Sequence, residues 1–190
     1  MTASRLRWLP NALTVLRLLA LPVLLALVLT ADGTTSTPAA VLFACVAVTD
    51  FVDGKLARAL QAETTFGRLA DPLADRLLVG GGLVGLIVMG RFAWPGPAVI
   101  LARDVLSVAA FVVLARRGVV LRVDMPGKVS STLAMFGTGF GLLLTSTWVD
   151  VLFWVAVAGS VVTLVNYAFT AVREHRAAVA AAATSPSTSG

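Results

Sequence analysis

The sequence predicts an all-α integral membrane protein with six transmembrane helices and both termini in the cytoplasm. Hydrophobic residues make up 58% of its 190 residues and charged residues only 13%, which is about half the usual charged share of soluble domains. Six apolar stretches are each about long enough to cross a bilayer. This composition excludes a soluble globule, a disordered chain and a disulfide-rich scaffold.

The first three predicted spans are residues 12–30, 38–58 and 72–90. Arg17 interrupts the first apolar run, and no A-x-A site follows it, so we expect a retained helix rather than a cleaved signal peptide. A short polar segment separates it from the second span. The third span follows a polar loop and contains a glycine-rich centre.

The last three predicted spans are residues 96–115, 129–146 and 149–171. The connections between all six are too short to hold a soluble domain. The chain therefore divides into a juxtamembrane segment (1–10), one six-helix domain (11–172) and a cytoplasmic tail (173–190). The tail is rich in Ala and then in Ser, Thr, Pro and Gly, so we expect it to be disordered from about residue 177.

The basic residues set the orientation, because cytoplasmic loops carry an excess of Lys and Arg. If the N-terminus is inside, Arg91 is the one basic residue in an outer loop, while Arg17 and Arg103 lie within spans. The inner ends and loops then carry Arg5, Arg7, Lys55, Arg58, Arg68, Arg76, Arg116, Arg117, Arg122, Lys128, Arg173 and Arg176. The high positive charge is thus explained by one membrane face, and no nucleic-acid partner is expected.

Four of the ten acidic residues, Asp50, Asp53, Asp71 and Asp75, flank one inner loop. On helices, the first two lie about 60° apart and the last two about 40° apart, so each helix presents a pair of carboxylates. Such all-oxygen clusters suit a hard divalent cation. Lys55 and Arg58 are expected to offset part of the charge. Spacing alone leaves two alternatives open, a structural ion-pair cluster and a proton or ion pathway.

The full motif carries a family resemblance. From Asp50 to Asp75 the chain matches the pattern D-x2-D-G-x2-A-R-x8-G-x3-D-x3-D at every fixed position. It thereby resembles the CDP-alcohol phosphotransferase family. The opening of the first span (residues 10–17), Ala102-Arg103-Asp104 and Gly127-Lys128 are similar to the phosphatidylglycerophosphate synthase branch of that family. The resemblance covers residues 5–172.

The resemblance implies transfer of a phosphatidyl group from CDP-diacylglycerol to an acceptor hydroxyl, with release of CMP. It implies two divalent ions, Mg²⁺ or Mn²⁺, held by the four aspartates, with Asp75 also serving as the general base. The residues implied to bind the CDP-linked donor are Asp53, Gly54, Ala57, Arg58 and Gly67.

The acceptor pocket is predicted from buried positive charge. Arg103 lies within a span and needs an anionic partner. Because Asp104 is expected to face elsewhere, we expect a phosphate on the acceptor to be that partner. Lys128 is expected to assist, with Arg116 and Arg117 as further candidates. Ser130 stands where the synthase pattern has a second basic residue, and it contributes one hydrogen bond but no charge.

The favoured acceptor is sn-glycerol 3-phosphate, which would give phosphatidylglycerophosphate. The alternatives are a cardiolipin synthase that uses phosphatidylglycerol and a phosphatidylinositol phosphate synthase, and a membrane ion or proton transporter is the alternative from another class. The expected place is the cell inner membrane, with the active site facing the cytoplasm. A homodimer is expected, with the G-x-x-x-G sequence from Gly81 to Gly85 as a candidate contact.

Overall fold

The computed structural model describes the chain over residues 9–59, 65–116 and 125–184, with side chains described over 15–51, 73–109 and 127–169. Within these ranges the regular structure consists of six α-helices and no strand. They are α2 (Leu9–Leu29), α3 (Thr37–Ala59), α4 (Thr65–Val88), α5 (Pro95–Arg116), α6 (Met125–Leu143) and α7 (Thr147–Thr184).

Helix starts follow local chemistry. Ser36 precedes α3, and its hydroxyl accepts a hydrogen bond from the backbone N–H of Ala39 at 3.4 Å, as an N-terminal cap does. The first turn of α5 contains Pro95 and that of α6 contains Pro126. Proline is tolerated there because the first N–H groups of a helix have no intrahelical acceptor.

The six predicted spans correspond in order to the six helices, but two helices extend well beyond the predicted span at one end. Helix α4 begins at Thr65 rather than at 72, because hydropathy marks where a helix is apolar and not where it starts. Helix α7 ends at Thr184 rather than at 171, so the stretch expected to be disordered from 177 is helical as far as Thr184. Its alanines have the highest intrinsic helix propensity. Residues 185–190 lie outside the described part of the chain.

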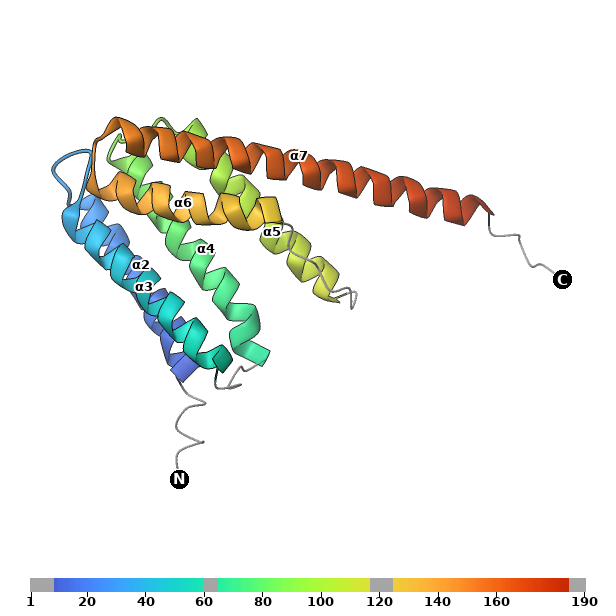
Figure 1. The fold of residues 1–190 in the computed structure, drawn as a ribbon, viewed down its shortest axis with the longest axis horizontal. Helices are drawn as coiled ribbons and strands as arrows, with labels where there is room; N and C mark the ends of the chain where they lie inside the picture. The colour runs from blue at the N-terminus through green and yellow to red at the C-terminus, as the bar shows by residue number, and fades with distance from the viewer. Residues whose placement is uncertain (1–8, 60–64, 117–124, 185–190) are drawn as a thin grey trace, which may run out of the picture.

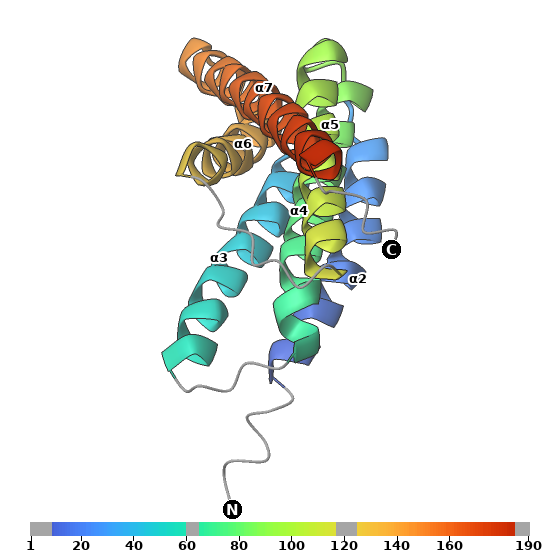
Figure 2. The same ribbon diagram turned by 90° about the vertical axis from the view of Figure 1, so that its right-hand side faces the viewer.

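Helix α4 is the centre of the molecule. It contacts α2, α3, α5 and α6, while α7 packs on α5 and α6. Figures 1 and 2 show α2, α3 and α4 running alongside one another, with α6 and α7 crossing them at a marked angle. The C-terminal part of α7 extends beyond the other helices (Figure 1). The core between these layers contains Leu24, Phe43, Leu83, Leu86, Ile100, Leu142 and Phe153, all almost completely buried.

The glycines of α4 allow close packing within the chain. A Cβ atom at Gly81 would lie 2.4 Å from Cδ1 of Leu21, and one at Gly85 would lie 2.8 Å from Cγ2 of Val28. Both neighbours belong to α2. The interpretation of this G-x-x-x-G sequence as a dimer contact is therefore wrong, because its small residues bring α2 against α4 in the same chain.

At the end of the molecule where α7 begins, Arg91 connects three segments. Its guanidinium forms an ion pair with Asp150 in the first turn of α7 and donates to the carbonyl of Leu144 at 3.3 Å. It also lies 4.5 Å from the centre of the Phe92 ring, which itself stacks on Phe153 at 3.9 Å. This end is held together by charge and aromatic packing.

One segment of the described residues, Thr147–Phe169 in α7, is long and apolar enough to cross a membrane, with a mean hydropathy of 2.0. Two shorter apolar segments, Val15–Leu29 and Thr37–Phe51, lie in α2 and α3. Large apolar side chains are exposed on the outer faces of the helices, among them Leu19, Val48, Val105, Val162 and Phe169.

Candidate active site

A cleft of about 280 Å³ lies between α3, α4, α5 and α6. It combines an apolar floor with charged and hydroxyl-bearing side chains. Its lining residues are Ala47, Asp50, Asp75, Arg76, Leu78, Val79, Asp104, Ser131, Thr132, Ala134 and Met135. Two of the four aspartates of the motif thus reach one cavity from different helices.

The acidic end of the cleft consists of Asp50 on α3 and Asp75 on α4, joined by Arg17 on α2. Nη1 of Arg17 lies 2.7 Å from Oδ1 of Asp75, and Nη2 pairs with Oδ1 of Asp50. Only 4% of the Arg17 side chain is exposed, whereas both carboxylates reach the cleft. A buried guanidinium requires such anionic partners. One arginine therefore connects three helices at the acidic end.

Arg17 is a site residue that sequence reasoning missed, as are Arg76 and Asp104 in the lining of the cleft. The sequence indicated only an arginine within a span, and Lys55 and Arg58 were the expected counter-charges; their side chains lie outside the described part. The available signal was the cost of a charge in an apolar helix, which demands a carboxylate from another helix. The sequence does not say which carboxylate.

The other predicted site residues are only partly placed. Asp53 and Asp71 lie on α3 and α4, one helical turn from Asp50 and Asp75, and their side chains lie outside the described residues. The same holds for Gly54, Ala57, Arg58, Gly67 and Arg116, while Arg117 lies outside the described residues altogether.

The donor set at the acidic end fits a divalent cation. The carboxylates of Asp50 and Asp75 offer oxygen ligands alone, which hard ions such as Mg²⁺ and Mn²⁺ prefer. Among the described side chains no group of three potential metal ligands occurs, because only two of the four aspartates are in that set. Helix α2 already brings a cation, the guanidinium of Arg17, to these oxygens.

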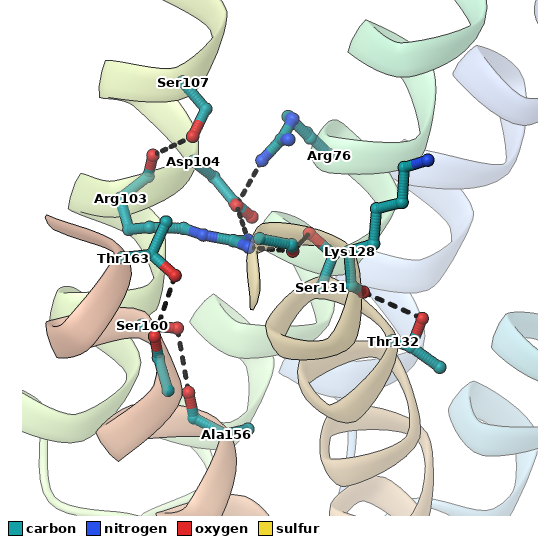
Figure 3. A network of polar contacts seen from close by, with 12 residues as sticks. Arg76, Arg103, Asp104, Ser107, Lys128, Ser131, Thr132, Ala156, Ser160 and Thr163 are labelled. Atoms are coloured by element: carbon teal, nitrogen blue, oxygen red, sulfur yellow. Dashed lines mark hydrogen bonds and ion pairs between the residues drawn. The ribbon is translucent and has the colours of Figure 1, made fainter. Parts of the chain in front are cut away.

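The basic end of the cleft is built on Asp104 of α5. Its Oδ1 accepts a hydrogen bond from Nη1 of Arg103 at 2.7 Å and another from Nη1 of Arg76, as Figure 3 shows. Nη2 of Arg103 donates to the carbonyl of Gly127 in α6 at 2.5 Å. Two guanidinium groups from α4 and α5 thus share one carboxylate oxygen.

The expectation that Asp104 faces away from Arg103 is wrong. An angle of about 100° separates consecutive Cβ directions on a helix, but the long arginine side chain turns back until its guanidinium meets the neighbouring carboxylate. Arg103 is 1% exposed and does not line the cleft. The premise that it lacks a protein partner therefore fails.

The hydroxyl groups near the basic end also differ from expectation. Ser130 is buried against α7, where a Cβ atom at Gly159 would lie 2.6 Å from its Oγ, so it does not line the cleft. Ser131 lines the cleft instead and donates to the carbonyl of Gly127 at 3.0 Å. Lys128 is exposed, and its side chain extends on the same side of the network as Arg76 in Figure 3.

Comparison with known proteins agrees with the motif. The family model described as CDP-alcohol phosphatidyltransferase matches residues 7–180. The chain is 33% identical to a probable phosphatidylglycerophosphate synthase of Mycobacterium tuberculosis (strain ATCC 25618 / H37Rv), over 90% of this chain and 85% of the relative. It is also similar to proteins named CDP-diacylglycerol--glycerol-3-phosphate 3-phosphatidyltransferase. One is from Bacillus subtilis (strain 168), 33% identical over 82% of this chain and 90% of the relative. Another is from Rickettsia typhi, 30% identical over 84% of this chain and 94% of the relative. With the motif, the cleft and these relatives in agreement, the chain belongs to the CDP-alcohol phosphatidyltransferase family.

Proposed function

We propose that this protein transfers the phosphatidyl group of CDP-diacylglycerol to sn-glycerol 3-phosphate and releases CMP. The observation that carries the proposal is the charge pattern of the cleft, where a carboxylate end and a guanidinium end adjoin on α4 at Asp75 and Arg76. Relatives that carry the name of this reaction cover nearly the whole chain. The chemistry needs both ends. The carboxylates would hold the cations that the donor diphosphate requires, and the guanidinium end would bind the acceptor, which is itself an anion.

Asp50, Asp53, Asp71 and Asp75 are the residues that would hold the two divalent ions. When bound, Mg²⁺ or Mn²⁺ would neutralise the diphosphate and stabilise the departing CMP. We assign to Asp75 the further role of general base, since a carboxylate within hydrogen-bond reach can take the proton of the acceptor hydroxyl. By pairing with both carboxylates, Arg17 holds Asp50 and Asp75 close together for metal binding and for proton transfer.

In the proposed reaction the acceptor hydroxyl oxygen attacks the phosphorus that bears the diacylglycerol. The bond from this phosphorus to the oxygen of CMP breaks, and the hydroxyl proton passes to Asp75. The donor nucleotide is assigned to the segment of the motif that contains Asp53, Gly54, Ala57, Arg58 and Gly67. Small residues there leave room for the nucleotide, and a guanidinium binds diphosphate oxygens in pairs.

The acceptor alternatives differ in their phosphate. Glycerol 3-phosphate and inositol phosphate carry a monoester dianion, whereas phosphatidylglycerol, the acceptor of a cardiolipin synthase, carries a diester. The basic end of the cleft favours the monoester, with Lys128, Arg116 and Arg117 as further cationic candidates. Membership of this enzyme family argues against the ion or proton transporter.

For the protein in its cellular setting we propose six membrane-spanning helices, a homodimer, and a cytoplasmic position for both termini and the cleft. The distribution of Lys and Arg supports this orientation. The exposed apolar faces of the helices support contact with lipid, because a protein in water rarely exposes such large apolar areas.

The test is CMP release by the purified protein in detergent with CDP-diacylglycerol and glycerol 3-phosphate. We expect release only when Mg²⁺ or Mn²⁺ is added. Asp50→Asn and Asp75→Asn should each lower turnover by about 100-fold or more, because replacing one member of a group of residues that act together removes most of the activity of the group. Asp75→Asn should weaken metal binding less than Asp50→Asn. Asp32→Asn, in an exposed connection, is the matched control. Metal-independent release, or near-normal turnover of Asp50→Asn, would contradict the proposal.

A further inference from the structure

We infer that Arg76 is the side chain that binds the phosphate of the acceptor, that Asp104 orients it, and that Arg103 is a buried support. The inference rests on the proposed function and deepens it, because it assigns the acceptor-phosphate contact to a residue of the cleft. It replaces the earlier assignment of that contact to Arg103.

The first argument is charge. Arg76 and Arg103 both donate to Oδ1 of Asp104, so two positive charges meet one negative charge. Arg103 is 1% exposed, and its Nε has no hydrogen-bond partner among the described residues. Among the described side chains, the positive charge at the basic end thus exceeds the negative charge by one. This balance favours binding of a further anion, because a guanidinium can form charge-assisted hydrogen bonds to more than one acceptor.

The second argument is access. The side chain of Arg76 is 27% exposed and lines the cleft, so a ligand can reach it. Arg103 is 1% exposed, donates to Asp104 and to the carbonyl of Gly127, and does not line the cleft. Of the two guanidinium groups, only that of Arg76 is available to a molecule in the cleft.

The third argument is geometry. Arg76 follows Asp75 in the chain, and consecutive Cα atoms lie about 3.8 Å apart. Both side chains line the same cleft. A small acceptor whose phosphate contacts Arg76 can therefore present its far hydroxyl to the carboxylate of Asp75. A guanidinium is suited to this task because it binds phosphate oxygens through two parallel N–H groups.

Asp104 has a positioning role in this arrangement. It uses one oxygen to hold the Nη1 atoms of both arginines, which fixes the guanidinium of Arg76 at the wall of the cleft. Its side chain is only 10% exposed, so the carboxylate stays against the two guanidinium groups and does not turn out into solvent. The remaining N–H groups of Arg76 are the ones assigned to the phosphate.

The experiment compares Arg76→Gln and Arg76→Lys with the wild type in the CMP-release assay, with glycerol 3-phosphate and CDP-diacylglycerol varied separately. For Arg76→Gln we expect the KM for glycerol 3-phosphate to rise about 10- to 100-fold, the range of one charge-assisted contact. The KM for CDP-diacylglycerol should stay within about twofold of the wild type. The KM of Arg76→Lys for glycerol 3-phosphate should lie between those of the wild type and Arg76→Gln, because lysine keeps the charge without the paired donors.

Binding without turnover provides a second readout. Glycerol 3-phosphate alone should raise the thermal unfolding temperature of the wild type, and Arg76→Gln should abolish this shift. Arg91→Gln is the matched control: it also removes an arginine paired with an aspartate, but at the other end of the molecule, and it should leave both KM values unchanged. If Arg76→Gln fails to fold, Arg76→Lys, which can still pair with Asp104, decides the question.

The possible failures are distinguishable. A wild type that transfers to glycerol 3-phosphate, together with an unchanged KM in both Arg76 variants, overturns the inference and leaves the proposed function intact. An increase confined to the KM for CDP-diacylglycerol also overturns it, and moves Arg76 to the donor diphosphate. A wild type that ignores glycerol 3-phosphate but consumes phosphatidylglycerol overturns the proposed function itself.

Discussion

Arg17 has an unusual position for a charged residue, because its guanidinium is buried while both of its carboxylate partners reach the cleft. Such an arrangement lets the protein hold Asp50 and Asp75 near each other before any other cation arrives. Without a cation between them, two neighbouring carboxylates repel each other, and this repulsion disfavours their ionised forms. The arginine thus maintains the acidic end in the folded protein.

Arg17→Gln tests this role. We expect the free energy of unfolding to fall by about 2 kcal/mol or more, since the variant removes a buried guanidinium that pairs with two carboxylates. Turnover should fall by at least about tenfold. Added Mg²⁺ should raise the unfolding temperature of the variant more than that of the wild type, because the ion replaces the missing positive charge. Thermal unfolding with and without Mg²⁺ measures both effects; wild-type stability and turnover in Arg17→Gln would contradict the role.

At the residue scale the motif singled out Asp50 and Asp75, which both line the cleft, but it did not indicate which cations face them. The spacing within the motif is local, so Asp50 and Asp75 could be recognised from the chain alone. Pairing of Arg17 with both of them spans 33 and 58 residues, and it depends on how α2 packs against α3 and α4. The Arg103–Asp104 pair was missed for the opposite reason, because side-chain length overrides the angle between neighbouring helical positions.

At the scale of elements, α4 joins the packing and the site. One part of it packs Gly81 and Gly85 against α2, and another presents Asp75 and Arg76 to the cleft. A shift of α4 relative to α2 would therefore displace both ends of the cleft together. The six apolar stretches were sufficient to predict this helix, but its packing partner depends on contacts between distant segments.

Gly85→Ala and Gly81→Ala should differ in stability. The added Cβ at Gly85 meets both methyl groups of Val28, at 2.8 and 3.1 Å, and a valine in a helix has one strongly preferred rotamer. The Cβ at Gly81 meets the end of the flexible Leu21 side chain. Alanine gains about 1 kcal/mol in helix propensity, while overpacking costs about 1–3 kcal/mol. We expect Gly85→Ala to be net destabilising and Gly81→Ala to be nearly neutral.

Thermal unfolding in detergent measures this difference, with Gly33→Ala as the control because no atom lies within 4 Å of its added Cβ. Equal stability of the two α4 variants would mean that α2 is not held rigidly at Val28.

At the scale of the whole molecule, the cleft lies where two groups of helices meet. Asp50 and Asp75 come from the group of α2, α3 and α4, while Asp104 and Ser131 come from α5 and α6. The ion pair between Arg76 and Asp104 crosses this boundary. The first group supplies Asp75 and Arg76 but not Asp104, which orients Arg76, so the complete lining forms only when the two groups are assembled.

The proposed orientation can be tested with thiol labelling. A cysteine at Gln61, in the connection between α3 and α4, should react with a membrane-impermeant reagent only after cells are opened. The native Cys45 is free and exposed, so the experiment needs the Cys45→Ser background. A matched cysteine at Gly33, in the connection between α2 and α3, should react in intact cells. The opposite pattern would reverse the orientation.

The length of α7 has a consequence for how the protein meets its surroundings. Its 38 residues make a rod of about 57 Å, nearly twice the hydrocarbon thickness of about 30 Å. The apolar segment Thr147–Phe169 already matches that thickness, so the following 15 residues, up to Thr184, would stand about 22 Å clear of the lipid. If all six helices cross the membrane, as proposed, this projection would emerge on the same side as the N-terminus and the acidic end. A protein bound or fused after α7 would thus be separated from the membrane by a rigid helical spacer. It would not cover the lipid surface across which the diacylglycerol donor must diffuse.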